Sequence, residues 1–519
     1  MNRWLGLGLL LALAGALVLR CPRLGMRPLH NDEAVNAIKL QTLWEKGEYV
    51  YDPDEFHGPA LHYLSLPLVW LSPARTADAW SEATLRLLPV FLGTALLLLL
   101  WLLRDGLGRP AILSAAALTA ISPAMVFYSR YFIHEMLLVF ATALTIAAAW
   151  RWRQTRHIGW AMLCGAGVGL MHATKETFII ALGAMVVAAV LTFATNRLRG
   201  GLVAHSPRTF NLKHGLAAVA VAGVISVVLF TSFFTNLSGP LDSIRTYLPW
   251  LSRAGGQSPH VHPWHFYLER LAFFHRADGP VWSEGLILIL AAIGTAPALS
   301  GRGLGQTNLG LARFLTFYTA TLTIAYAAIP YKTPWCLLGF LHGMILLAGL
   351  GVVALMRLAA RSRMRLGLGV LLAAAAVHLA WQAWALSHVY FADRRNPYVY
   401  AQTVTGIRPL VEKTEALAKL APQGHATVVK VMAPDSDYWP LPWYLRHFKH
   451  VGWWDKIPAD PYAPMMIVSA NLNATLDEKS AKRHLMAGLF EMRPGVFFEL
   501  YVELELWRKY VAGLPRERE

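Results

Sequence analysis

Residues 28–63 read PLHNDEAVNAIKLQTLWEKGEYVYDPDEFHGPALHY and follow closely after an apolar run from Trp4 to Leu19. The stretch concentrates acids and histidines in a chain that is otherwise basic and apolar: Asp32, Glu33, Glu45, Glu48, Asp52, Asp54, Glu55, His30, His57 and His62. Charged groups are costly beside a bilayer, so their concentration at its edge indicates a function. The outer acids, from Glu45 to Glu55, fit a solvated connecting loop equally well. The adjacent pair Asp32-Glu33 predicts a site.

The composition is that of a polytopic membrane protein. Of 519 residues, 55% are hydrophobic and only 15% charged, and the mean hydropathy is +0.41. The formal net charge of +16 would point to nucleic acid in a soluble protein, but arginines between membrane spans account for it here. The three cysteines form no CxxC pair, which argues against a zinc knot or a redox motif.

Eleven apolar runs of spanning length predict about eleven transmembrane helices. They cover residues 4–20, 85–103, 111–129, 135–150, 158–174, 177–195, 214–234, 283–299, 312–329, 336–355 and 366–386. The first run resembles a signal peptide, but Arg20-Cys21-Pro22-Arg23 is not a small-residue cleavage site, so we interpret it as a retained span. Residues 61–71 are apolar but short, which favours an interfacial or re-entrant segment.

The positive-inside rule orients these spans. With the N-terminus in the cytoplasm, alternate connections carry most of the arginines and almost no acid. They include Arg104, Arg109, Arg151, Arg153, Arg156, Arg197, Arg199, Arg208, Arg302, Arg313, Arg357, Arg361, Arg363 and Arg365. The first external loop (21–84), the loop at 235–282 and the C-terminal segment then lie outside the cytoplasm, in a plasma or inner membrane.

Three short turns on the same outer side also carry charge. The first turn contains Arg130, His134 and Glu135, and the second contains Lys175 and Glu176. The third contains Lys332 between two prolines. Each turn alone could be a helix end, because prolines stop helices and long basic side chains snorkel. Their presence on the face that also carries Asp32-Glu33 favours an active site between helices. In the loop at 235–282, the histidine-rich stretch 258–265 lacks an adjacent carboxylate, so we interpret it as a lid or substrate-facing segment rather than a metal site.

The chain changes character near residue 387, where charged residues become more frequent. We therefore divide it into a membrane domain, residues 1–386, and a soluble extracytoplasmic α/β domain, residues 387–519. Within the second domain we expect strands at 426–432, 465–470 and 496–501, and helices at 400–420 and 476–489. Residues 435–445 predict a turn that leads into a short aromatic helix. No phosphate-cradling glycine motif is present, so we expect no nucleotide cofactor.

These residue types fit transfer from a lipid-linked donor, because activated nucleotide-sugars are generally confined to the cytoplasm. Asp32 could act as general base on an acceptor hydroxyl, with Glu33 supporting it. Arg130, Lys175 and Lys332 could stabilise a phosphate leaving group. A further set of side chains could orient the acceptor or hold a divalent metal, the one cofactor we consider: His134, Glu135, Glu176 and His57.

An acidic pair in the first external loop resembles the GT-C superfamily of membrane glycosyltransferases, including the protein O-mannosyltransferases and the lipid A aminoarabinose transferases. The segment from Arg130 to Glu135 is similar to the Arg-x4-Asp of the mannosyltransferases, with Glu in place of Asp. Further blocks resemble the branch of flippase-activity-associated proteins: residues 30–34, 51–59, 330–335, 439–444 and 493–495. The resemblance implies a GT-C fold, a polyprenyl-phosphate sugar donor, an acceptor outside the cytoplasm, and Asp32 as base.

Two other functions stay open at this stage. A flippase for lipid-linked sugars, or its accessory subunit, should show repeated halves and charges near the bilayer midplane, and the sequence shows neither clearly. A receptor or scaffold that binds a partner through its C-terminal domain would tolerate alanine in the charged turns. The leading prediction is an inverting transferase that moves a mannose-like hexose or pentose to a protein, glycan or lipid.

Overall fold

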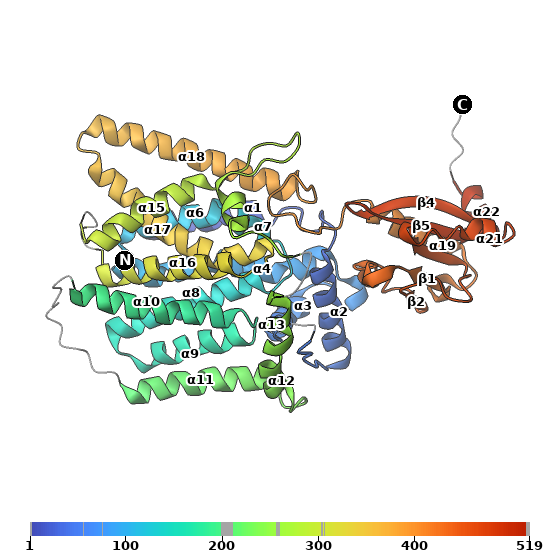
Figure 1. The fold of residues 1–519 in the computed structure, drawn as a ribbon, viewed down its shortest axis with the longest axis horizontal. Coiled ribbons are helices and arrows are strands. Elements are labelled where there is room, and N and C mark those ends of the chain that lie inside the picture. The colour runs from blue at the N-terminus through green and yellow to red at the C-terminus, as the bar shows by residue number, and fades with distance from the viewer. Residues whose placement is uncertain are drawn as a thin grey trace. The chain divides into compact units, whose positions relative to one another are not determined.

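The structure is a computed structural model that describes residues 3–54, 57–74, 76–198, 211–255, 260–302, 305 and 307–514. Glu55, Arg199, Arg208 and residues 256–259, which entered the sequence predictions, lie outside the described residues. The chain forms two compact units (Figure 1). The first comprises residues 1–24, 46–71 and 86–400, and the second comprises residues 25–45, 72–85 and 401–519. The units are therefore interleaved along the chain, whereas the sequence predicted one division at residue 387.

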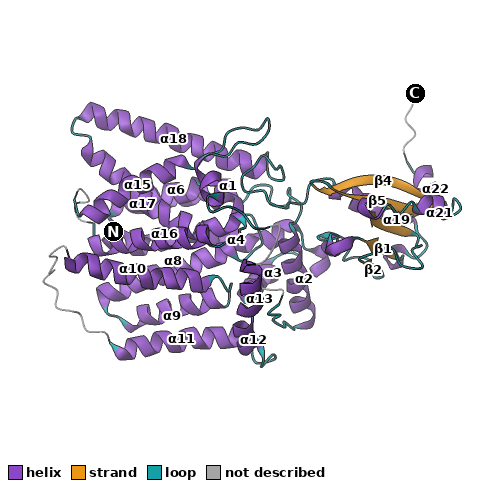
Figure 2. Cartoon of the chain, in the orientation of Figure 1, coloured by secondary structure: helices purple, strands orange, loops and turns teal. Residues whose placement is uncertain are grey.

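The first unit is helical, as Figure 2 shows. Its main helices are α1 (Arg3–Arg20), α3 (Ala60–Leu71), α4 (Glu82–Leu99), α5 (Arg104–Leu107), α6 (Arg109–Ile121), α7 (Pro123–Tyr128), α8 (Glu135–Thr155), α9 (Ile158–His172), α10 (Phe178–Leu198), α11 (Leu212–Phe230), α12 (Gly239–Arg245), α13 (Tyr247–Gly255), α14 (Phe266–Ala272), α15 (Gly285–Ser300), α16 (Leu309–Ala328), α17 (Leu338–Leu358) and α18 (Ser362–His388). Every apolar run predicted from the sequence falls on helix.

The predicted count of about eleven transmembrane helices is not confirmed. Among the described residues, seven helical segments are long and apolar enough to cross a membrane. They are Arg3–Arg20, Glu82–Leu107, Glu135–Thr155, Phe178–Leu198, Leu212–Phe230, Pro334–Leu358 and Ser362–His388. The helices α9 and α15 are shorter, and α16 carries Arg313 and several threonines. Residues 60–71 form one of the shorter apolar helices, in agreement with the prediction that this segment is too short to span.

The run at 111–129 is broken because Pro123 follows Ser122. Proline cannot continue a helix but is favoured at a helix start, so α6 ends at Ile121 and α7 begins at Pro123. The Ser122 hydroxyl caps the new helix by accepting from Met125 N–H, and it donates to Glu284 Oε2 at 2.5 Å. Glu284 Oε1 accepts from Ala124 N–H at 2.8 Å, so one buried carboxylate holds the break.

Close helix packing in this unit relies on small residues, as is usual between membrane helices. The backbones of α15 and α17 approach so closely that a Cβ on Gly351 would lie 1.9 Å from Leu290 O. A Cβ on Gly294 would lie 2.0 Å from Leu347 O. Larger residues at either position would force the two helices apart.

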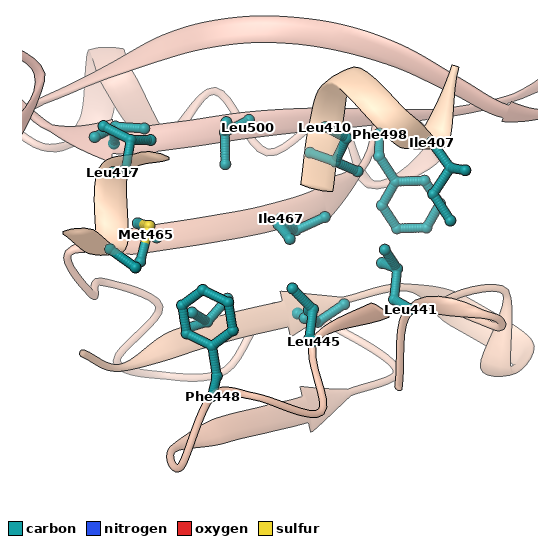
Figure 3. Packing of buried hydrophobic residues seen from close by; sticks show 14 of the residues in the cluster. Ile407, Leu410, Leu417, Leu441, Leu445, Phe448, Met465, Ile467, Phe498 and Leu500 are labelled. Atoms are coloured by element: carbon teal, nitrogen blue, oxygen red, sulfur yellow. The ribbon is translucent and has the colours of Figure 1, made fainter. Parts of the chain in front are cut away.

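The second unit contains α2 (Asn31–Lys46), α19 (Ile407–Leu420), α20 (Leu441–Tyr444), α21 (Leu476–Lys479), α22 (Leu504–Ala512) and one mixed sheet. The strands are β1 (Val429–Met432), β2 (Val451–Trp454), β3 (Met465–Ser469), β4 (His484–Arg493) and β5 (Val496–Glu503), in the order β2-β1-β3-β5-β4. β1 pairs in parallel with β2 and β3, while β5 pairs antiparallel with β3 and β4. Figure 3 shows the core on the sheet face to which α19 contributes, where Leu410 and Leu417 pack against Ile467 and Leu500.

The predicted α/β character of this region is confirmed, but two elements were missed and one was wrong. Strand β2 and helix α22 were not predicted, and the helix expected over 476–489 ends at Lys479. Residues from His484 onward instead pair with β5 as the hairpin strand β4. Leu485, Met486, Leu489 and Phe490 satisfy helical spacing, but the partner strand beside them decides the outcome.

Candidate functional site

Asp32 and Glu33 lie in the first turn of α2, where His30 and Glu33 form a reciprocal cap. The backbone N–H of His30 donates to Glu33 Oε2 at 3.0 Å, and the N–H of Asp32 donates to His30 Nδ1 at 3.1 Å. A capping box has this arrangement, with histidine here in the place of serine or threonine. The sequence His30-x-x-Glu33 therefore begins the helix that displays Asp32.

The two adjacent acids have opposite environments. The Glu33 side chain is 0% exposed and lies 3.6 Å from Arg27 Nη2, so its charge is compensated inside the protein. The Asp32 side chain is 50% exposed, with His30 Nδ1 3.7 Å from its Oδ1. Glu33 thus stabilises the helix start, and Asp32 is the acid left accessible for chemistry.

The segment that leads into α2 is fixed by residues from the C-terminal part of the same unit. The Tyr444 hydroxyl accepts from Leu29 N–H at 2.9 Å, and Gln402 Nε2 donates to Pro28 O at 3.1 Å. Arg408 Nη2 donates to Gly25 O at 2.5 Å. These contacts explain why residues 25–45 cluster with the sheet domain rather than with the helices that flank them in sequence.

In the first unit, the three charged turns, which the sequence predicted to share one face, contact one another. Lys175 Nζ donates to Glu135 Oε1, which joins the second turn to the first. The Trp335 ring lies 6.3 Å from the Tyr131 ring, which brings in the third turn. The side chains of Lys175 and Glu135 are 7% and 6% exposed. The three turns thus lie close together around a buried ion pair. That they form an active site with Asp32 and Glu33 stays a prediction.

The charge on Lys175 is already compensated. Burial acts to lower the pKa of Lys175, but the Glu135 carboxylate, with Cys336 and Glu176, raises that pKa above its ordinary value. Lys175 is therefore held protonated by protein groups. Its position fits a structural role as well as the predicted phosphate contact.

His57 and Glu176 form a second acid–base pair, and Glu176 directly follows Lys175 in the sequence. The distance from His57 Nδ1 to Glu176 Oε1 is 2.9 Å. Burial acts to raise the pKa of Glu176, but His57 and Lys175 lower it to about 2. The His57 side chain is 38% exposed, whereas that of Glu176 is 9% exposed. This geometry is that of an imidazole oriented by a buried carboxylate.

The backbone beside His57 is locked to the turn after α9. Gly58 N–H donates to Thr174 O at 3.0 Å, and Ala60 N–H donates to Ala173 O at 2.9 Å. A Cβ on Gly58 would lie 2.2 Å from Ala173 O, so only glycine permits this approach. Residues 57–60 and 173–176 are consequently one rigid platform.

His134 occupies the buried centre of a histidine cluster. Its ring lies 5.1 Å from the His57 ring and 5.8 Å from the His62 ring, and its Nε2 lies 3.1 Å from Gly58 O. Burial, with His57 and His62, holds the pKa of His134 well below its usual range. The imidazole is therefore neutral. Within the described part of the chain, no group of three or more His, Cys, Asp or Glu side chains could hold a metal ion.

Arg130 makes helix-terminal contacts. Its Nη1 donates to Arg20 O and Pro22 O, both at 2.7 Å, so it caps the carboxyl end of α1. Arg20 has a similar role at another helix end. It is fully buried, and its guanidinium donates to Ala120 O at 2.8 Å and Thr119 O at 2.9 Å at the end of α6. Arg20 was not singled out from the sequence. The contacts of Arg130 are those of a basic residue at a helix end, which the sequence analysis left open as an alternative to phosphate binding.

Lys332 has a different environment. Its Nζ donates to His262 O at 3.1 Å and to Ile329 O, and the described residues offer it no carboxylate within ion-pair distance. Burial lowers the pKa of Lys332. The lysine is held by a short antiparallel bridge between Val261 and Tyr331, which joins the histidine-rich loop to the third turn. Lys332 is thus a buried cation without a compensating anion in the described structure.

Aromatic and basic groups lie close to Lys332, and Tyr400 and Arg270 among them were not predicted from the sequence. His260 Nδ1 and His262 Nε2 lie 2.7 and 2.9 Å from the Tyr400 hydroxyl. Burial, with Arg270, His260 and Lys332, lowers the pKa of His262 to about 4, so it is neutral near pH 7. Arg270 packs 3.5 Å over the Phe266 ring. Arg270 and Glu284 carried no sequence signal beyond being charged residues at short helices.

Two adjoining apolar cavities run into the helices from these turns. One is lined by Glu135, Thr177, Trp335 and Cys336 at one end and by residues of α8, α10, α16 and α17. The other shares Val139, Thr142, Tyr318 and Gly339 with it and extends to His342 and Leu346. Glu135, the partner of Lys175, is therefore part of the wall of a narrow and mainly apolar pocket.

Comparison with known proteins fits this architecture. Residues 66–236 match the family model described as dolichyl-phosphate-mannose-protein mannosyltransferase, a segment that includes Arg130, His134, Glu135, Lys175 and Glu176. No curated protein matches the sequence.

Two solved structures share the fold over most of their length. The chain is similar to ArnT from Cupriavidus metallidurans bound to undecaprenyl phosphate, at 14% identity over 96% of this chain and 98% of that chain, with a TM-score of 0.62. It is also similar to the oligosaccharyltransferase AglB from Archaeoglobus fulgidus in complex with an inhibitory peptide and a dolichol-phosphate. That match has 13% identity over 98% of this chain and 77% of that chain, with a TM-score of 0.56.

The chain is therefore an integral membrane protein with the fold of the GT-C glycosyltransferases. The resemblance to this superfamily predicted from its sequence is confirmed. Its placement in the flippase-activity-associated branch stays a prediction.

Proposed function

We propose that this protein is a membrane glycosyltransferase that moves a sugar from a polyprenyl-phosphate carrier to an acceptor outside the cytoplasm. One observation carries the proposal: Glu135, which is ion-paired with Lys175, lines a mainly apolar pocket between helices. A donor with a charged phosphate and a long apolar tail requires such a juxtaposition. Two structures that share the fold hold an undecaprenyl phosphate and a dolichol-phosphate, respectively.

We place the apolar tail of the donor along the narrow, mainly apolar pockets between these helices. Their walls are mainly leucine, alanine, valine and aromatic side chains from α8, α10, α16 and α17. Burial of each methylene in such surroundings contributes about 0.8 kcal/mol. The polar end of the donor would then lie among the turns that carry Glu135, Lys175 and Trp335.

Lys332 is the cation best suited to the donor phosphate. Lys175 is compensated by Glu135, and the Arg130 guanidinium donates to carbonyl groups at the end of α1. Lys332 lies under the histidine-rich loop, and the described residues give it no ion-pair partner. A phosphate would supply the missing negative charge, because charge-assisted hydrogen bonds are strongest where water is excluded. Lys175 and Arg130 would then stabilise the phosphate mainly through the electrostatic field of their charges near it.

The chemical step is an inverting displacement at the anomeric carbon of the donor sugar. As the acceptor oxygen forms its bond to that carbon, the bond from carbon to the phosphate oxygen breaks, and both its electrons leave with polyprenyl phosphate. The acceptor proton passes to a carboxylate, for which we propose Asp32 because it is the exposed member of its pair. Glu33 supports Asp32 by capping α2. The sugar would be a hexose or pentose, and the acceptor a protein, glycan or lipid.

The orientation proposed for the chain follows the arginine distribution, with the N-terminus in the cytoplasm. Under this proposal the turns at residues 129–135, 174–176 and 330–335 face the extracytoplasmic side. On that side no nucleotide-sugar donor is needed, because the polyprenyl-phosphate carrier would bring the sugar to the acceptor.

The test uses purified protein in liposomes with radiolabelled polyprenyl-phosphate sugars and a membrane extract as acceptor source. Donor consumption is compared for the natural protein, Asp32→Asn and Glu45→Gln, an exposed acid on the same helix. We expect Asp32→Asn to lose consumption by about 10³-fold, as general-base loss typically costs 10²–10⁴-fold, while Glu45→Gln is unchanged. Consumption of no donor by the folded protein, with movement of labelled lipid between leaflets, would favour a flippase instead.

A further inference from the structure

The connection after α11 carries a continuous apolar stripe on its outer side. Large apolar side chains recur every three or four residues along α12 and α13, which is the spacing of one helix face. The stripe comprises Phe234, Leu237, Leu241, Ile244, Leu248 and Leu251, with exposed fractions of 62, 76, 51, 65, 72 and 60%. Scattered exposed leucines are normal on a protein, but a continuous line of this length marks an interaction surface.

The opposite face of α12 and α13 is polar and packs against Pro53 and Glu176. Asp242, Ser243 and Thr246 are buried. Thr246 Oγ1 donates to Pro53 O at 3.0 Å, and the Tyr247 hydroxyl donates to Glu176 O at 3.2 Å. The inward face of α12 and α13 therefore holds the turn that contains Glu176.

The position of the stripe identifies what covers it. Helix α11 is long and apolar enough to span a membrane. One face of it packs closely on α9, where a Cβ on Gly165 would lie 2.0 Å from Ala218 O. Its other side exposes apolar side chains such as Leu216, Val219 and Val224, which suit contact with lipid. The stripe begins directly after α11, where Ser232, Phe233 and Phe234 adopt left-handed φ angles of 49°, 56° and 71° that turn the chain sharply. Figure 1 shows α12 and α13 running across the end of α11 rather than along it. The apolar surface of α11 thus continues into the stripe at the edge of the bilayer.

The flanking side chains fit the boundary between headgroups and acyl chains. Arg245 is 59% exposed and pairs with Asp242 at 3.1 Å, and Tyr247 and Trp250 lie between the polar and apolar faces. Basic and aromatic residues at the border of an apolar face are typical of helices that lie in a membrane interface.

We propose that α12 and α13 lie in the interface of the membrane, with the stripe among the acyl chains, and that they anchor the turn holding Glu176 at the bilayer surface. The ligand of the stripe is a lipid surface. Thr246 and Tyr247 transmit this anchoring to Pro53 and Glu176 through hydrogen bonds to backbone carbonyls. The inference does not depend on the proposed transferase activity.

The test measures whether lipid or water contacts the stripe. Cys21, Cys164 and Cys336 are replaced by serine, and one cysteine is introduced at Leu248→Cys and labelled with an environment-sensitive fluorophore. The full chain is reconstituted in phosphatidylcholine–phosphatidylglycerol vesicles. Quenching by spin-labelled lipid is compared with quenching by iodide in the water phase. Val219→Cys, on α11, is the lipid control, and Asp460→Cys, which is 84% exposed in the sheet domain, is the water control.

We expect the Leu248 label to be quenched by spin-labelled lipid, and by iodide at least about threefold less than the label at position 460. A label at Ile244→Cys should behave in the same way, which guards against a local disturbance at one position. Iodide quenching equal to that at position 460 would overturn the inference in favour of water. Protection from both quenchers would overturn it in favour of a covering protein. Unchanged elution and melting of each labelled chain confirm that it is folded.

Discussion

Two lysines at the edge of the membrane helices, Lys175 and Lys332, look alike in the sequence and differ in the structure. Both follow an apolar run, and both were predicted to bind the donor phosphate. Lys175 is paired with the Glu135 carboxylate, whereas Lys332 donates only to carbonyl oxygens in the described structure. The partner, and not the residue type, decides whether a buried cation stabilises the fold or is available to a ligand.

The largest effect is expected from breaking the compensated pair. Glu135→Gln leaves Lys175 as a buried charge without its partner, and removal of one member of a buried ion pair costs about 3–5 kcal/mol. Denaturant unfolding in detergent micelles measures this loss. The double variant Glu135→Gln with Lys175→Met should recover more than half of it, since both charges are then gone. A single variant as stable as the natural protein would show that the pair is not buried in solution.

Lys332→Met should give the opposite pattern, with loss of donor use and little loss of stability. A hydrogen bond to a charged group contributes about 1.5–3 kcal/mol, which corresponds to a reduction of kcat/KM by about 10- to 100-fold. The free energy of unfolding should change by less than about 1 kcal/mol, because no carboxylate is left unpaired. Lys332→Arg keeps the charge and serves as control. Lysine-to-methionine variants with equal kinetics at 175 and 332 would remove the distinction between the two sites.

The pH dependence of donor binding should also separate the two lysines. Burial lowers the pKa of Lys332, so its positive charge is lost as pH rises through a value below the ordinary lysine pKa of about 10.4. Donor affinity should therefore fall by about tenfold per pH unit above that folded pKa. Lys332→Arg should remove the decline, because arginine stays protonated. A decline that persists in Lys332→Arg would assign it to another group.

The smallest effect is expected at His57 and Glu176. The folded pKa of Glu176 is lowered to about 2, so its contribution to stability is present above its unfolded value of 4.5 and is lost as pH falls toward 2. Because His57 is partly exposed, Glu176→Gln should cost only about 1 kcal/mol at pH 7. The cost should shrink between pH 4.5 and pH 2. An equal cost at pH 7 and near pH 2 would show that the pair does not contribute through charge.

Charge at a membrane edge is informative, and several candidate residues that it indicated lie together in the structure. The pairs His57–Glu176 and Glu135–Lys175 consist of such residues. Their role in a site stays a prediction. The partners of each group were not predictable. That Arg130 would cap α1, or that Arg20 and Glu284 would be buried anchors, depends on which helix ends approach one another.

The sheet domain shows the same limit for secondary structure. The hydrophobic pattern located β1, β3 and β5 and the helix α19, because their apolar side chains are buried in one core against the sheet. Residues 484–489 satisfied a helical pattern and became a strand, because β5 offers a hydrogen-bonding edge beside them. A local sequence cannot report such an edge in advance.

By itself the sequence determined a membrane protein with helices at each apolar run, a mixed α/β region near the C-terminus and charged turns between helices. These properties follow from the cost of placing polar groups in hydrocarbon, which acts on each segment separately. Tertiary structure alone decided the pairing of Lys175, the lack of a carboxylate partner for Lys332 among the described residues, the exposure of Asp32 beside buried Glu33 and the packing of residues 25–45 with the sheet domain. Those outcomes depend on distances between groups remote in sequence, and electrostatic and hydrogen-bond energies are set by such distances.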